Sequence, residues 1–113
     1  MDFDQFSVGP LTTQADAPLR SDEENDAIQD AHRSHLSDLH HAGSLLCAGP
    51  LADRHLRGMI LFRTDVATAS ELMADAPAVR ARWFDVAVVR WMVPCGAMEF
   101  AMTTFPRSVT DLR

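Results

Sequence analysis

The residues best suited to chemistry lie between positions 32 and 57. His32 and His35 stand three residues apart in a stretch of helical periodicity, and Asp53 follows a short apolar strand and a Gly-Pro turn. An imidazole titrates near neutral pH, and a neighbouring carboxylate orients it and stabilises its protonated form. We therefore predict His35 and Asp53 as a catalytic pair for general acid–base chemistry.

The same residues also have a structural interpretation, in which Asp53 satisfies a buried histidine or caps the turn that follows Pro50. Arg57 lies just past this turn, where it can bind a substrate carboxylate with two N–H groups or pair with a surface acid. Trp83 and Trp91 can each line an aromatic pocket or serve core and interface packing. We predict that Arg57, His32 and Trp91 bind the substrate.

Other kinds of site find little support in the sequence. His32 and His35 could share an ion, but no Cys-Xaa-Xaa-Cys or His-Glu-Xaa-Xaa-His motif accompanies them. All ten basic residues are arginine, which excludes a lysine Schiff base. The chain has no Gly-Xaa-Ser-Xaa-Gly elbow and no glycine pattern for phosphate. We expect neither a metal nor a cofactor.

Composition describes a small globular protein. The 113 residues, of which 47% are hydrophobic and 23% charged, are expected to form one domain over 1–113, with a C-terminal arm at about 97–113. The net charge of −6 argues against nucleic acid or an anionic membrane as partner. Cys47 and Cys95 are expected to be free thiols, Cys47 buried and Cys95 more exposed. With no signal peptide pattern and no spanning apolar run, a cytoplasmic location is predicted.

The first half of the chain predicts a strand and a long helix. Alternation over Phe3–Val8 indicates a strand that Gly9-Pro10 ends, and 12–20 is expected to be a loop. Ser21 with Glu24 matches a capping box, so a helix is expected from Ser21 to about Ala42. Its predicted buried stripe consists of Ile28, Ala31, His35, Leu39 and Ala42, with His35 near the middle. The predicted solvent-facing side carries Arg33, Ser34, Ser37 and His41.

The remaining elements complete a fold. Strands are expected at 44–48, 58–63 and 83–93, with a helix at 66–74 capped by Thr64 or Asp65 and a helical turn at 76–80. A further short strand or an arm is expected at 98–105. The order β-α-β-β-α-β is that of a ferredoxin-like α+β sandwich with an antiparallel sheet.

Both faces of the last predicted strand are apolar. Its two sets of alternating side chains are Phe84, Val86, Val88 and Met92 on one face, and Ala87, Val89, Trp91 and Val93 on the other. A sheet covered by helices on one side should show one polar face. We therefore expect a homodimer packed sheet to sheet through the face of Ala87, Val89 and Trp91.

The segment 32–51, HRSHLSDLHHAGSLLCAGPL, has a helix with His-Leu, a Gly-Xaa-Leu-Leu strand and then Ala-Gly-Pro. In this it resembles the YCII-related family, and the match extends through Leu56-Arg57-Gly58, residues 75–79 and residues 91–98. The resemblance implies a ferredoxin-like fold that dimerises into an α+β barrel, and a His–Asp pair at His35 and Asp53. The broader superfamily includes muconolactone isomerases and a dechlorinating enzyme of aromatic degradation.

Two functions are compatible with these observations. In the first, the chain is a small cofactor-free lyase or isomerase whose His35 moves a proton on a small aromatic or lactone-like organic acid, with Asp53 orienting the imidazole and Arg57 holding the acid. In the second, it is a non-catalytic dimer that binds a ligand or regulates another protein. A pocket open to solvent beside His35 favours the first, and a filled core there favours the second.

Overall fold

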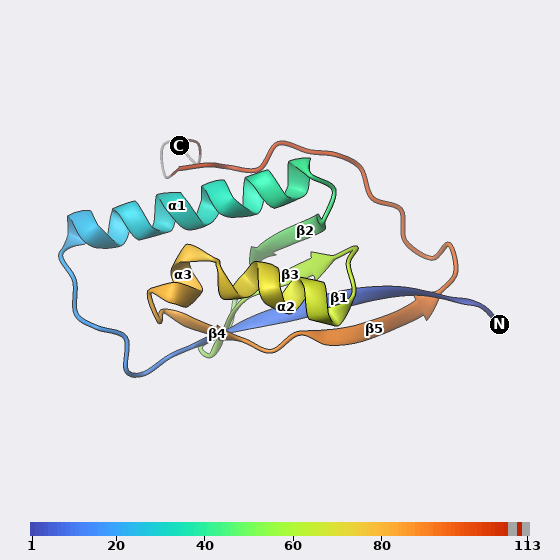
Figure 1. The fold of residues 1–113 in the computed structure, drawn as a ribbon, viewed down its shortest axis with the longest axis horizontal. Helices are drawn as coiled ribbons and strands as arrows, with labels where there is room; N and C mark the ends of the chain where they lie inside the picture. The colour runs from blue at the N-terminus through green and yellow to red at the C-terminus, as the bar shows by residue number, and fades with distance from the viewer. Residues whose placement is uncertain (109–110, 112–113) are drawn as a thin grey trace.

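The structure is a computed structural model in which residues 1–108 and residue 111 are described. Within these residues the chain forms an α+β fold with an antiparallel sheet and the order predicted from the sequence, except that the last strand is divided (Figure 1). The elements are β1 (Phe3–Thr13), α1 (Asp22–His41), β2 (Leu45–Pro50), β3 (Leu56–Phe62), α2 (Val66–Ala74), α3 (Pro77–Arg80), β4 (Phe84–Val86) and β5 (Val89–Pro94). No described helix is long and apolar enough to cross a membrane.

The strand order is that of a ferredoxin-like sheet. It runs β2-β3-β1-β4, and β5 also pairs with β1, so β4 and β5 together take the place of one last strand. The N-terminal half of β1 pairs with β5, and its C-terminal half pairs with β4. All of these pairings are antiparallel. The predicted fold class is therefore confirmed.

The strands β2 and β3 differ from the predicted 44–48 and 58–63 by one or two residues at each end, and two larger differences involve Pro10. β1 does not end at Gly9-Pro10 but continues to Thr13, because Pro10 pairs by register with Met59 of β3. The expected strand 83–93 is interrupted between Val86 and Val89. The interruption lies opposite Gly9-Pro10, where the proline has no N–H to contribute to a strand ladder.

The long helix α1 begins as its sequence predicts. Ser21 is the N-cap: its hydroxyl accepts the Glu24 N–H at 3.1 Å, and the Glu24 carboxylate accepts the Ser21 N–H at 3.1 Å. This capping box satisfies two N–H groups that the helix cannot pair internally. At the other end Gly43 follows the cap residue Ala42 with φ +84, a conformation that favours glycine. At α2, Asp65 is the N-cap and accepts the Thr68 N–H.

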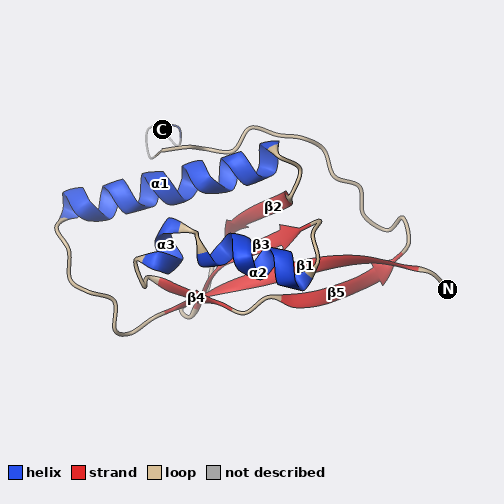
Figure 2. Ribbon diagram, viewed as in Figure 1, coloured by secondary structure: helices blue, strands red, loops and turns tan. Residues whose placement is uncertain are grey.

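The main core lies between the three helices and one face of the sheet (Figure 2). Its buried members are Leu11, Leu45, Ile60, Phe62, Ala69, Met73 and Ala76. A second apolar cluster lies on the opposite face, which we call the open face; its buried members are Phe6, Leu46, Leu61 and Val93. Met98 and Phe100 pack against this second cluster, so the chain crosses the open face after β5. Several open-face side chains nevertheless remain exposed, among them Val89 and Trp91.

The buried side of α1 differs from the predicted stripe. The buried residues are His32, Ser37 and His40, and Ala31 and Ala42 are exposed. Ser37 was expected on the solvent side but is buried because residues 103–107 lie against the helix there, as Figure 1 shows for the C-terminal stretch of the chain. Helical periodicity predicts a single buried side, whereas α1 is covered on two sides, by the main core and by residues 103–107. The expected strand at 98–105 does not form, and this stretch is an extended arm.

The expected burial of Cys47 is also wrong, since both cysteines are exposed free thiols. The β2–β3 register shifts between Leu45 and Cys47, so Leu45 and Leu46 are both buried and Cys47 lies opposite Leu61 on the open face. Partial desolvation still raises the pKa of the Cys47 thiol.

Candidate functional site

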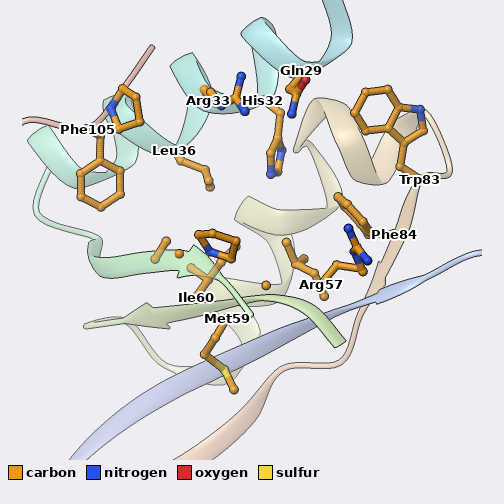
Figure 3. A pocket seen from close by; sticks show the side chains of 16 residues that line it. Gln29, His32, Arg33, Leu36, Arg57, Met59, Ile60, Trp83, Phe84 and Phe105 are labelled. Atoms are coloured by element: carbon orange, nitrogen blue, oxygen red, sulfur yellow. The ribbon is translucent and has the colours of Figure 1, made fainter. Parts of the chain in front are cut away.

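A mostly apolar cavity of about 240 Å³ lies between α1 and the sheet (Figure 3). Pockets for drug-sized ligands span about 300–1,000 Å³, so this cavity suits a smaller molecule. Its apolar walls come from several elements and include Leu11, Leu36, Ile60, Trp83, Phe84 and Phe105. Few polar side chains line it, and they come from α1 and β3: Gln29, His32, Arg33 and Arg57.

His32 extends from α1 into this cavity (Figure 3) and is only 9% exposed. Burial, with smaller contributions from the charges of His35 and Arg33, lowers the pKa of His32 to about 4. The ring is therefore neutral at pH 7. Its Nδ1 is buried and has no hydrogen-bond partner within the described chain. An unpaired buried nitrogen is unfavourable, so the wall of the cavity contains an imidazole whose hydrogen-bonding capacity is not fully used by the described chain.

Two arginines line the same cavity. Arg57, on β3, is exposed, and its Nη1 donates to the Asp53 carbonyl at 3.4 Å. It is the one hydrogen bond that the Arg57 side chain donates to the described residues, so most of the five N–H donors of its guanidinium are left for a carboxylate. Arg33, expected on the solvent side of its helix, is half-buried, and its Nη1 has no partner among the described residues. The cavity thus combines an apolar interior with positive charge at its edge.

The structure places His35 outside this cavity. His35 is half-buried, not central to the buried side, and its Nε2 hydrogen-bonds to the Leu72 carbonyl of α2 at 3.2 Å. This hydrogen bond pairs the Nε2 atom of His35 with a backbone carbonyl. His32, one turn earlier, is the imidazole that faces the cavity.

Asp53 lies in the exposed connection between β2 and β3. Its Oδ2 accepts the N–H groups of Leu56 at 2.8 Å and His55 at 2.9 Å. These hydrogen bonds, that of Leu56 first, lower the pKa of the Asp53 carboxyl. The geometry is that of a side chain capping a turn. No hydrogen bond or ion pair between Asp53 and His35 exists in the described part of the chain, and their catalytic pairing stays a prediction.

The two tryptophans lie on different faces of the sheet. Trp91 pairs by register with Phe6, a member of the open-face cluster, and is 44% exposed. It does not line the cavity. The tryptophan at the cavity is Trp83, which adjoins β4 and stacks edge to face with Phe84 at 6.4 Å. Of the five predicted site residues, the structure therefore brings together His32 and Arg57.

The cavity also has a wall that sequence reasoning missed. Phe105 and Pro106, from the C-terminal arm, line it. Figure 3 shows Phe105 beside α1. The local sequence, Phe105-Pro106-Arg107, contains no pattern that predicts which part of the fold the arm contacts.

No group of three or more potential metal ligands is present among the described residues.

The fold and this site can be compared with known proteins. No similar sequence was found among curated proteins. The model of one protein family, the YCII-related domain, matches residues 11–92. That match covers most of the chain, including the helix carrying His32, the turn with Asp53 and the strand with Arg57, and it ends within β5. The chain therefore belongs to the YCII-related family.

Proposed function

We propose that this protein binds a small organic acid in the cavity between α1 and the sheet and moves a proton on it without a cofactor, as a lyase or isomerase does. The observation that carries the proposal is that one small apolar cavity contains a neutral imidazole and a guanidinium. Among residues 1–108 and 111, Nδ1 of that imidazole has no hydrogen-bond partner, and the guanidinium donates one long hydrogen bond. The apolar walls favour a hydrocarbon or aromatic body. Arg57 supplies a donor pair for a carboxylate.

His32 is the candidate base of this proposal. A neutral imidazole accepts a proton on one ring nitrogen, and a bound carboxylate nearby favours the protonated form, which raises the pKa of the ring from its low value in the free protein. Ligand binding would thus both position the acid and increase the basicity of His32. The His35–Asp53 pair remains the alternative acid–base machinery, but each of these residues already has other hydrogen-bond partners.

The open face supports a second part of the proposal, that two copies of the chain associate. Val89 is 53% exposed and Trp91 44%, and they lie beside the buried members of the open-face cluster. A sheet face with large exposed apolar side chains is commonly covered by a partner. Sedimentation of the wild type at micromolar concentration should give a dimer, and Val89→Asp should dissociate it. A wild-type monomer would contradict this part.

Calorimetry with benzoate and a proton-exchange assay with phenylpyruvate test the main proposal. Arg57→Gln is expected to weaken benzoate binding roughly tenfold or more, because a hydrogen bond to a charged group contributes about 1.5–3 kcal/mol. Arg54→Gln, in the adjacent exposed loop and outside the cavity, is the matched control and should bind as the wild type does. Equal affinities for the two variants would contradict the assignment of Arg57.

The catalytic step has its own measurement. Phenylpyruvate carries acidic C–H bonds next to its carbonyl, and their exchange in D₂O is followed by NMR. The wild type should accelerate the exchange and His32→Gln should abolish the acceleration while still folding. Benzoate binding without any acceleration would support a non-catalytic ligand-binding or regulatory protein and refute the enzyme.

A further inference from the structure

We infer that Phe105, on the C-terminal arm, determines the ligand specificity of the cavity by restricting it to acids that carry a flat ring. The inference rests on the proposed function, since it concerns the same cavity. It extends that function to residues 97–107, which lie beyond the family match at residues 11–92. The specificity of this chain would therefore come from a part of the sequence that the family pattern does not cover.

The first observation is that the arm is fixed to α1 near its end. Arg107 donates to the Ser37 hydroxyl at 3.0 Å, to the Ser34 hydroxyl at 2.8 Å and to the Asp38 carboxylate at 2.9 Å. These three acceptors lie at positions i, i+3 and i+4, on one side of the helix. A single guanidinium thus joins the arm to two successive turns of α1, immediately after the residues that line the cavity.

The second observation is that His40 positions Phe105 itself. His40 is 2% exposed; its Nδ1–H donates to the Leu45 carbonyl at 2.8 Å, and its Nε2 accepts the Thr103 N–H at 3.2 Å. Both nitrogens are therefore used, which fixes the ring plane. The Phe105 ring stacks on it with centroids 4.3 Å apart and planes 18° from parallel. Stacking on the buried ring of His40 therefore holds the Phe105 ring in one orientation.

The third observation is where Phe105 lies relative to the other rings. In Figure 3 it stands at one end of the cavity and Trp83 and Phe84 at the other, and all three are lining residues. Aromatic side chains interact favourably with a ligand ring through edge or offset contacts. The rings of Phe84 and Phe105 have no hydrogen-bonding group, so the hydroxyl groups of a sugar-like acid would lose their hydrogen bonds to water against these walls. The occupant that these walls fit is an aromatic carboxylate, with its charged group toward Arg57.

The chain offers a matched control on the same arm. Phe100 is also aromatic but packs on the open face, edge to face with Phe6 at 5.5 Å, and does not line the cavity. Replacing Phe100 removes the same side chain from the same arm without altering the cavity wall. Any effect that comes only from loosening the arm should appear in both variants.

The experiment measures the affinities of benzoate and butyrate by calorimetry for the wild type, Phe105→Ala, Phe105→Leu and Phe100→Ala. The wild type should prefer benzoate. Phe105→Ala should reduce the benzoate-to-butyrate affinity ratio roughly two- to tenfold, the range expected for one aromatic contact. Phe105→Leu, which keeps an apolar side chain and serves if the alanine variant fails to fold, should reduce the same ratio. Phe100→Ala should leave it unchanged.

The outcomes separate this inference from the function on which it rests. If the wild type binds benzoate and Arg57→Gln weakens it, but the Phe105 variants keep the wild-type ratio, the specificity role is refuted and the proposed function stands. An equal fall in the ratio for Phe100→Ala also refutes it, because the effect would then come from the arm as a whole. If the wild type binds neither acid at millimolar concentration, both proposals are refuted.

Discussion

Lowering the pH from 7 to 5 should destabilise the folded protein through His32. In the unfolded chain a histidine binds a proton near pH 6.5, whereas burial holds the pKa of His32 at about 4 in the folded state. Between these values the unfolded state binds more protons than the folded state. The contribution of neutral His32 is therefore complete above about pH 6.5 and is lost as the pH falls toward 4.

The magnitude follows from the two pKa values. A shift from 6.5 to about 4 corresponds to about 3 kcal/mol of unfolding free energy when the loss is complete. Between pH 7 and pH 5 the expected loss is about 2 kcal/mol. That is a large part of the stability of a small domain, which is typically about 5–15 kcal/mol.

Urea denaturation at pH 7, 6 and 5 measures this effect in three proteins. His32→Gln removes the titrating group, so its stability should fall by about 2 kcal/mol less than that of the wild type between pH 7 and 5. His41→Gln changes an exposed histidine of the same helix and should retain the wild-type pH dependence. The reasoning is refuted if His32→Gln and the wild type lose the same free energy over this range.

Three further predictions concern the fold. Ser21→Ala removes the capping box with Glu24 and should lower the free energy of unfolding by about 1 kcal/mol in chemical denaturation; an unchanged midpoint would contradict the cap. Gly43→Ala should cost about 1–2 kcal/mol, because a Cβ there contacts nothing and the penalty comes from the positive φ alone; a neutral result would contradict that backbone conformation. The Cys95 thiol donates a hydrogen bond to the Asp4 carboxylate, and this hydrogen bond and the negative charge of Asp4 raise the pKa of the thiol. Asp4→Asn should therefore increase the rate at which iodoacetamide alkylates Cys95 at pH 8, and an unchanged rate would contradict the contact.

Local signals in the sequence predict the elements and their order well. The capping box at Ser21 and the Asp65 cap are readable because each depends on residues three positions apart. The βαββαβ order then implies the sheet, and the observed strand order agrees with it. Pro10 was misassigned because a proline usually ends a strand, whereas here it lies inside β1 at the position where β4 and β5 are interrupted.

The site was harder to predict because it depends on contacts between distant residues. Helical spacing predicts His35 near the middle of the buried side of α1, but it cannot tell that His32 faces the cavity and that His35 meets the Leu72 carbonyl. Phe105 lies about seventy residues from the helix turns it covers, so no local pattern connects them. Trp91 was assigned to the site from its residue type, whereas its register with Phe6 places it on the open face.

The most direct test of the central claim is an NMR titration of the His32 ring with and without saturating benzoate, with benzyl alcohol as a neutral control of similar shape. In the free protein His32 should stay neutral down to about pH 4. Benzoate should raise the pKa of His32 and benzyl alcohol should not, because only a carboxylate in the cavity stabilises the protonated ring. If saturating benzoate leaves the titration of His32 unchanged, the account of this cavity as a site for organic acids is contradicted.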